Sequence, residues 1–134
     1  MIVVAILWSL FVVITVHELG HFMVAYVLRR PISSMTVGFG PLIYEKLWDG
    51  MWFRFRLVPL SGNVTMCWRS RRSWKNISIL AGGPFANFIL AGTMWGTTLG
   101  TVSMLVGFLN LVPRRFGDID SDGLLIMREL RRMT

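Results

Sequence analysis

Two long stretches without a charged residue constrain this chain more than any other feature. Residues 1–16 and 77–113 contain no Asp, Glu, Lys or Arg. A transmembrane helix needs about 20 apolar residues, each of which adds about 1.5 Å. The segment from Ile2 to Leu28 is long enough for one crossing, and residues 77–113 would make about 55 Å of helix, enough for two short crossings. The glycines at Gly96 and Gly100 predict the break between those two.

The predicted fold is therefore an all-α polytopic membrane protein with three transmembrane helices. A small membrane-associated β-hairpin is expected beside them on the cytoplasmic side, because residues 53–57 alternate apolar and charged side chains, which is the period of a strand. Pro59 and Gly62 confine the continuation of this strand to an edge or a turn. The length of the chain predicts a single domain over residues 1–134.

Composition excludes several classes of protein. Hydrophobic residues make up 54% of the chain and the mean hydropathy is +0.58, whereas disordered chains combine low hydrophobicity with high charge. Cys67 is the only cysteine, so a disulfide scaffold is excluded. A net charge of +7 would suit a nucleic-acid binder, but such a protein needs no long uncharged stretches, and we expect no nucleic-acid partner.

The positions of the cations predict an orientation in the cell membrane. The 14 Lys and Arg residues fall within residues 29–75 and 114–134. Three crossings place both blocks on one side, which the positive-inside rule makes the cytoplasm, with the N-terminus outside. No cation precedes the first apolar run and no small-x-small site closes it, which argues against a cleaved signal peptide. We therefore expect a multi-pass protein whose partner is the lipid bilayer.

The sequence His-Glu-Leu-Gly-His at residues 17–21 contains both histidines of the chain. On a helix this spacing places His17 and His21 on one face, where both can bind one metal ion. Glu18 can then act as general base on a metal-bound water, as in zinc metalloproteases. The alternative is a pair of core histidines with a chance carboxylate. At membrane depth such groups cost several kcal/mol without compensation, which favours the zinc site.

Two histidines leave a tetrahedral catalytic site one protein ligand short. With no third histidine in the chain, the remaining ligand could be Cys67, an acidic residue or a group from another chain. Cys67 lies among tryptophan and arginine residues and is more typical of an inert interfacial thiol. The acidic candidates follow the second apolar stretch: Asp118, Asp120 and Asp122.

Several motifs in series resemble the site-2 protease family of intramembrane zinc metalloproteases, and the similarity extends over most of the chain. They are His-Glu-Leu-Gly-His at 17–21, Val-Gly-Phe-Gly-Pro at 37–41, the strand-like segment 53–66, Gly-Pro-Phe-Ala-Asn at 83–87, Asn-Leu-Val-Pro at 110–113 and Asp122-Gly123. The resemblance implies that His17, His21 and Asp122 bind Zn²⁺ and that Glu18 activates water. It also implies that Asn87 donates a hydrogen bond to the substrate backbone or to the oxyanion, rather than only bonding a neighbouring helix.

A calcium loop overlaps the acidic segment. Asp118, Asp120 and Asp122, followed by Gly123 and by Glu129, match the spacing of an EF-hand. An EF-hand needs a helix entering the loop, which Pro113 and Gly117 disfavour. The stretch Leu124–Leu130 is more simply a short helix packed against the core.

The predicted activity is zinc-dependent endoproteolysis of transmembrane or membrane-proximal segments of substrate proteins. The edge of the predicted strand could hold an extended substrate by strand addition, or its arginines could simply lie among lipid headgroups. The alternative function is a non-catalytic metal-binding membrane protein, such as an inactive relative or a metal sensor. Nothing in the sequence indicates the oligomeric state.

Overall fold

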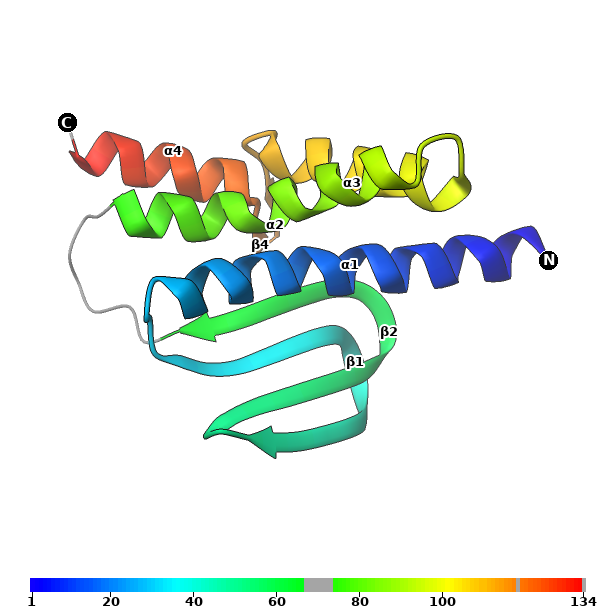
Figure 1. Cartoon of the computed structure of the whole chain (residues 1–134), viewed down its shortest axis with the longest axis horizontal. Helices are drawn as coiled ribbons and strands as arrows, with labels where there is room; N and C mark the ends of the chain where they lie inside the picture. Colours follow the sequence, from blue (N-terminus) through cyan, green and yellow to red (C-terminus); the bar gives the residue numbers. More distant parts are fainter. Residues whose placement is uncertain (67–73, 118, 134) are drawn as a thin grey trace.

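The computed structural model of the chain describes residues 1–66, 74–117 and 119–133. Helix α1 lies between a curled β-hairpin on one side and a layer of three further helices on the other (Figure 1). In chain order the elements are α1 (Ile2–Val27), β1 (Ile32–Trp48), β2 (Met51–Met66), α2 (Trp74–Thr93), α3 (Thr98–Leu111), β3 (Arg115–Phe116), β4 (Ile119–Asp120) and α4 (Asp122–Met133).

The prediction of an all-α protein with three transmembrane helices is wrong. Among the described residues, α1 is the single helix long and apolar enough to cross a membrane. Helix α3 has 14 residues and is about 21 Å long, which is shorter than the hydrocarbon core of a bilayer. The two main strands contain 17 and 16 residues. The fold is therefore a mixture of helices and a large hairpin.

The error arose because an apolar run does not show where its helices begin and end. Helix α2 starts at Trp74, within the cationic segment, and includes Lys75 and Asn76. The break itself was predicted correctly, since α2 ends at Thr93 and α3 starts at Thr98. Gly96 lies in this turn with a φ of +80°, a conformation that glycine adopts without strain.

The hairpin curls so that one stretch of β1 has neighbours on both sides. Residues 34–37 face residues 62–65 of β2 on one side and residues 52–55 on the other. Asp49 and Gly50 form the turn, both at positive φ, as a two-residue hairpin turn requires. The apolar face of the hairpin packs on α1, in a core made by Ile14, Met35, Val37 and the partly buried Phe11, Phe22, Phe53, Phe55 and Val64.

Helices α1 and α2 approach closely at a pair of glycines. A Cβ on Gly82 would lie 2.6 Å from the backbone oxygen of Gly20, and a Cβ on Gly20 would collide with the backbone oxygen of Gly82. Small residues allow two helix backbones to pack at this short distance. The contact sets α2 directly against the face of α1 that contains the two histidines.

Candidate metal centre

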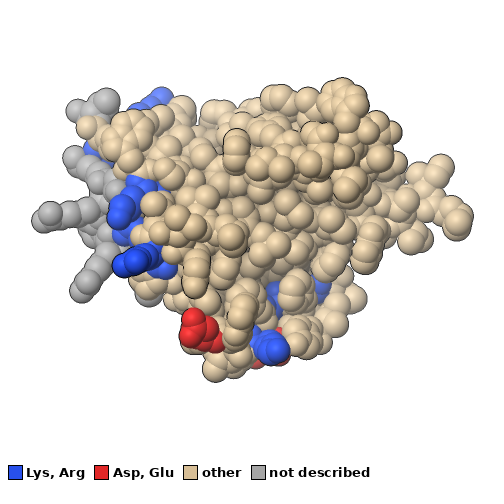
Figure 2. Space-filling model, in the orientation of Figure 1, with Lys and Arg blue, Asp and Glu red and all other residues tan. Residues whose placement is uncertain are grey.

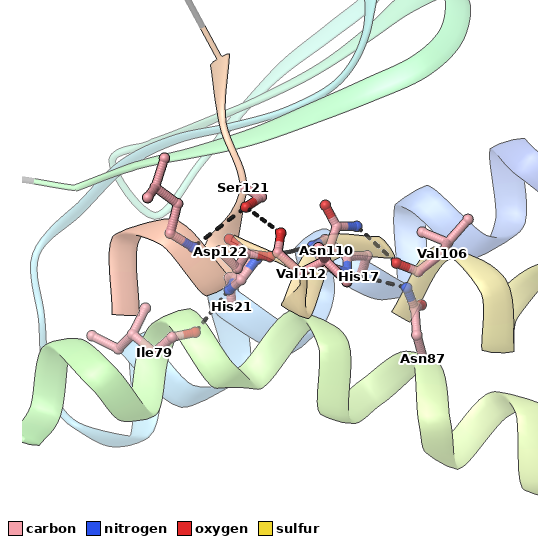
Figure 3. Close-up of polar contacts among 10 residues, drawn as sticks. His17, His21, Ile79, Asn87, Val106, Asn110, Val112, Ser121 and Asp122 are labelled. Atoms are coloured by element: carbon pink, nitrogen blue, oxygen red, sulfur yellow. Dashed lines mark hydrogen bonds and ion pairs between the residues drawn. The ribbon is translucent and has the colours of Figure 1, made fainter. Parts of the chain in front are cut away.

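Three side chains from opposite ends of the chain meet at one point. His17 and His21 lie one turn apart on α1, and Asp122 is the first residue of α4 (Figure 3). The Nε2 atoms of the two histidines are 3.2 Å apart. Oδ2 of Asp122 lies 2.9 Å from Nε2 of His17 and 3.4 Å from Nε2 of His21. The structure thus brings together the three residues predicted as zinc ligands.

The spacing of these atoms fits a tetrahedral zinc ion. With metal–ligand distances of about 2.0–2.1 Å, two ligands of a tetrahedral ion are separated by about 3.3 Å. The three observed separations, 2.9, 3.2 and 3.4 Å, lie around this value. Two imidazoles and one carboxylate are also a donor set that Zn²⁺ uses in catalytic sites, with the fourth position open.

Gly83 makes the room that the histidines need. A Cβ at this position would collide with Nε2 of His21 and would lie 2.8 Å from Cε1 of His17. Gly83 therefore lies on the face of α2 against the donor atoms. Any side chain there would displace the imidazoles from the positions that let them bind one ion.

A backbone carbonyl fixes the orientation of His21. Its Nδ1 donates a hydrogen bond of 2.7 Å to the backbone oxygen of Ile79. The proton of the neutral ring is therefore on Nδ1, and the lone pair of Nε2 points to the shared centre. Such outer hydrogen bonds set the tautomer of metal-binding histidines.

Asp122 is held ionised at the start of α4. Its burial opposes the charged form, but its contacts with His17 and His21 outweigh that effect and lower the pKa of the carboxyl to about 2. The preceding Ser121 caps the helix, because its Oγ accepts the backbone N–H of Leu124 at 3.3 Å. Ser121 Oγ also donates to the backbone oxygen of Val112 at 2.8 Å, which ties α4 to the end of α3.

Glu18 lies beside the centre and is almost fully buried, with 5% of its surface exposed. A cavity of about 820 Å³ includes Glu18, both histidines and Asp122 in its lining. Gly62 of β2 lies directly against the Glu18 side chain, and a Cβ there would overlap its carboxylate. The rest of the lining is mostly apolar and includes Leu10, Ile14, Leu60, Val64, Met66, Ile79, Leu80, Val106, Ile119 and Leu125.

A protein-family model described as Peptidase family M50 matches residues 5–101 of the chain. The chain belongs to peptidase family M50. This confirms the predicted resemblance to the site-2 protease family. The matched region includes His17, Glu18, His21 and Asn87, whereas Asp122 lies beyond it.

Curated relatives of this M50 family member carry similar names. One from Thermotoga maritima, named "Putative zinc metalloprotease", is 27% identical over 130 residues, which cover 79% of this chain and 26% of that protein. "Putative zinc metalloprotease CA_C1796" of Clostridium acetobutylicum is 30% identical over 105 residues, covering 70% and 31%. A Chlamydia pneumoniae protein of similar name is 27% identical over 106 residues, covering 62% and 17%. The chain thus spans less than a third of the length of these relatives.

The described acidic residues of the predicted calcium loop, Asp120, Asp122 and Glu129, do not converge in this M50 family member. Asp122 points to the histidines, Asp120 forms an ion pair with Arg128, and Glu129 accepts a 2.9 Å hydrogen bond from Asn76. Strands β3 and β4 occupy the place of an entering helix, and α4 confirms the helix predicted at 124–130. Asp118 and Cys67, the other possible ligands, lie outside the described residues.

The two predicted asparagines have different positions. Asn110 lines the cavity, and its amide donates to the backbone oxygen of Val106 at 3.1 Å. Asn87 is fully buried behind His17, with its Nδ2 3.1 Å from Nδ1 of that ring (Figure 3). The described residues that line the cavity do not include Asn87.

The residues that hold the metal-binding side chains and Glu18 in place were not predicted from the sequence. Ser121 could have been found, because Ser followed by Asp and Gly before an apolar run is typical of a helix N-terminus. The carbonyl of Ile79 and the space beside Gly62 have no signal in a single sequence, because each depends on a contact between distant segments.

Proposed function

We propose that this chain is the catalytic core of a zinc-dependent endopeptidase that cleaves transmembrane or membrane-proximal segments of other proteins. The observation that carries the proposal is the convergence of His17, His21 and Asp122 within the cavity that Glu18 also lines. Membership of family M50 and the names of the relatives support it. A site with three protein ligands and one open position is typical of catalytic rather than structural zinc.

When bound, zinc would polarise the attacking water and the carbonyl of the scissile peptide bond. Glu18 acts as the base and accepts the proton that the water loses as it attacks. The resulting carboxylic acid then donates this proton to the amine of the leaving half, so the carboxylate is regenerated in each cycle. The burial of Glu18 keeps the proton close to the reacting atoms between the two steps.

The last stretch of β2 supports a role in holding substrate. Residues 60–64 line the cavity, and among the described residues the stretch 62–66 pairs only with residues 32–37 of β1. One edge of this stretch thus retains backbone groups that an extended peptide can pair with. A helical substrate hides its own amides, so cleavage requires an unwound segment. We propose that this segment binds to β2 by strand addition.

The surface supports a membrane location. The first turns of α1 are exposed although they are apolar, with Ile2 and Trp8 at 77% and 67% exposure. Lys and Arg residues gather at the opposite end, where α1 ends, α2 begins and α4 ends (Figure 2). We propose that α1 crosses the cell membrane with its uncharged N-terminus outside and Arg29 and Arg30 on the cytoplasmic side. His17 and His21 then lie about 10–17 Å inside that boundary.

The proposal is tested with the variant Glu18→Gln, which keeps the volume of the side chain and removes the base. Zinc content should stay unchanged, and cleavage of a model transmembrane substrate in proteoliposomes should fall at least about 100-fold. Glu45→Gln, on β1 and paired with Arg54, is the matched control and should cleave like the original chain. Full cleavage by Glu18→Gln would refute the mechanism. Zinc binding without any cleavage by the original chain would favour the non-catalytic metal-binding alternative.

A further inference from the structure

Asn87 carries an unused hydrogen-bond acceptor next to the metal centre. Its side chain has no exposed surface, and its Oδ1 is buried without a hydrogen-bond partner among the described residues. Its Nδ2, on the same amide, lies 3.1 Å from Nδ1 of His17. Buried polar atoms of this kind are uncommon and require an explanation.

The arrangement around His17 is consistent for a site without metal. Nε2 of His17 lies 2.9 Å from a carboxylate oxygen of Asp122, so the ring proton is on Nε2, which donates to that oxygen. Nδ1 then has a lone pair and accepts a hydrogen bond from the Asn87 amide nitrogen. Each neutral imidazole has one donor and one acceptor nitrogen, and both atoms of His17 have a matching partner.

Zinc requires the opposite arrangement. The metal would bind Nε2 of His17, because that atom faces Nε2 of His21 and the carboxylate of Asp122. The one proton of the neutral ring must then leave Nε2 and be carried by Nδ1. His21 already has this form, with its Nδ1 donating to the backbone oxygen of Ile79. For His17, an acceptor must replace the Asn87 amide nitrogen.

We propose that Asn87 is a positioning residue whose amide follows the tautomer of His17. Without metal its Nδ2 donates to Nδ1. With zinc bound the amide is turned by about half a rotation about its terminal torsion, which is soft and roughly two-fold, and Oδ1 accepts from the Nδ1–H of His17. The proton count of the ring is unchanged, since the proton released from Nε2 goes to solvent and solvent supplies the proton taken up at Nδ1. The proposal rests on the zinc site of the proposed function.

The backbone of Asn87 is fixed while its amide turns. Its carbonyl oxygen accepts a 2.8 Å hydrogen bond from the Oγ of Ser103 on α3, and Ser103 is also fully buried. Ser103 thus holds the backbone of Asn87 and leaves its side-chain amide free to turn.

The test measures zinc affinity by chelator competition on the purified full chain in detergent. Asn87→Leu removes the acceptor and should weaken zinc binding about 10- to 100-fold, the usual effect of losing an outer partner of a metal-binding histidine. Asn87→Asp supplies an acceptor at the same position and should stay within about threefold of the original chain. Gly92→Ala, in the same helix, is the matched control and should do the same, because a Cβ there meets nothing within 4 Å in the described part of the chain. Unchanged zinc affinity in Asn87→Leu would overturn the proposal. If that variant lost only kcat, Asn87 would act on the substrate and not on the metal site. An equal loss in Asn87→Asp and Asn87→Leu would overturn it as well.

A second measurement needs no variant, and so remains decisive if Asn87→Leu does not fold. The ¹⁵N spectrum of His17 should show an unprotonated Nδ1 in the metal-free protein and a protonated Nδ1 after addition of zinc. A protonated Nδ1 in both states would overturn the proposal. Neither measurement uses proteolysis, so a failure here is distinguishable from a failure of the proposed activity.

Discussion

At the scale of single residues, the metal centre depends on three glycines, which have no side chain. Gly83 lies against the two imidazoles, Gly62 against the carboxylate of Glu18, and Gly123 against the backbone oxygen of Leu111. Each of the three would place a Cβ within another group. The donor atoms and the base therefore keep their positions because α2 and β2 present bare backbone to them, and Gly123 lets α4 pack closely on the end of α3.

Gly83→Ala should weaken the metal site, because its Cβ collides with Nε2 of His21. We expect zinc affinity, measured by chelator competition, to fall at least about tenfold. Gly92→Ala is the matched control: it lies in the same helix, and a Cβ there meets nothing within 4 Å in the described part of the chain. This control should keep its zinc and stabilise the helix by about 0.5–1 kcal/mol. Equal affinity in both variants would contradict the packing argument.

Asp122→Ala and Glu129→Ala separate zinc from calcium at the acidic segment. Asp122→Ala leaves two histidines, too few for a tight site, so zinc content by atomic spectroscopy should drop sharply. Glu129→Ala should leave zinc content close to that of the original chain, because Glu129 bonds Asn76 and not the centre. Calcium binding that is lost in Glu129→Ala would instead support the EF-hand. If Asp122→Ala kept its full zinc content while Asp120→Ala lost zinc, the third ligand would be Asp120 and not Asp122.

The predictability of these residues depends on how far apart they lie in the chain. His17 and His21 could be predicted because four residues are about one helical turn, whatever the rest of the fold does. Asp122 lies 105 residues from His17, and its place among Asp118, Asp120 and Cys67 came only from the family resemblance. The partner of Asn87 could not be predicted, because burial behind His17 results from the packing of α1 on α2.

At the scale of elements, hydropathy predicted where the apolar segments lie in the chain but not where each helix begins and ends. The apolar run 77–113 predicted two crossings. However, α2 begins at Trp74, three residues before this run, and α3 ends at Leu111, two residues before the run ends. The strand predicted at 53–66 was confirmed as β2. Its long partner β1 was not predicted in full, because Gly38 and Gly40, both at positive φ, interrupt the alternating pattern at the bend.

The close packing of α1 on α2 gives a prediction about stability. In Gly82→Ala the new Cβ would lie 2.6 Å from the Gly20 backbone oxygen and 2.9 Å from Cγ2 of Val24. We expect a loss of about 1–3 kcal/mol, as for other overpacked sites, seen as a lower Tm in detergent. Gly92→Ala again serves as the control, and an unchanged Tm in Gly82→Ala would mean that the two helices can separate without cost.

At the scale of the whole molecule, the two ends of α1 differ in charge. The exposed N-terminal turns of α1 are apolar, whereas the other end of the molecule is cationic (Figure 2). Helix α1 is the element shared by every layer, since it contacts the hairpin, α2 and α3. This asymmetry supports the proposed orientation of α1 in a bilayer.

The proposed orientation can be measured with reporters at the two ends of the chain. A reporter placed before Met1 should be external, and one placed after residue 134 should be cytoplasmic, because α1 is proposed to cross with its cationic end inside. Reversing the charges of Arg29 and Arg30 should weaken this preference. Both reporters on the same side of the membrane would contradict the proposed orientation.

The centre joins α1 to α4, which are made at different times during synthesis. His17, Glu18 and His21 leave the ribosome early, whereas Asp122 follows 105 residues after His17. At 5–20 residues per second, about 5 to 20 s pass between them. During that interval the nascent chain has the base and two ligands but lacks the third. The proposed zinc site can therefore assemble only after the hairpin, α2 and α3 have been synthesised.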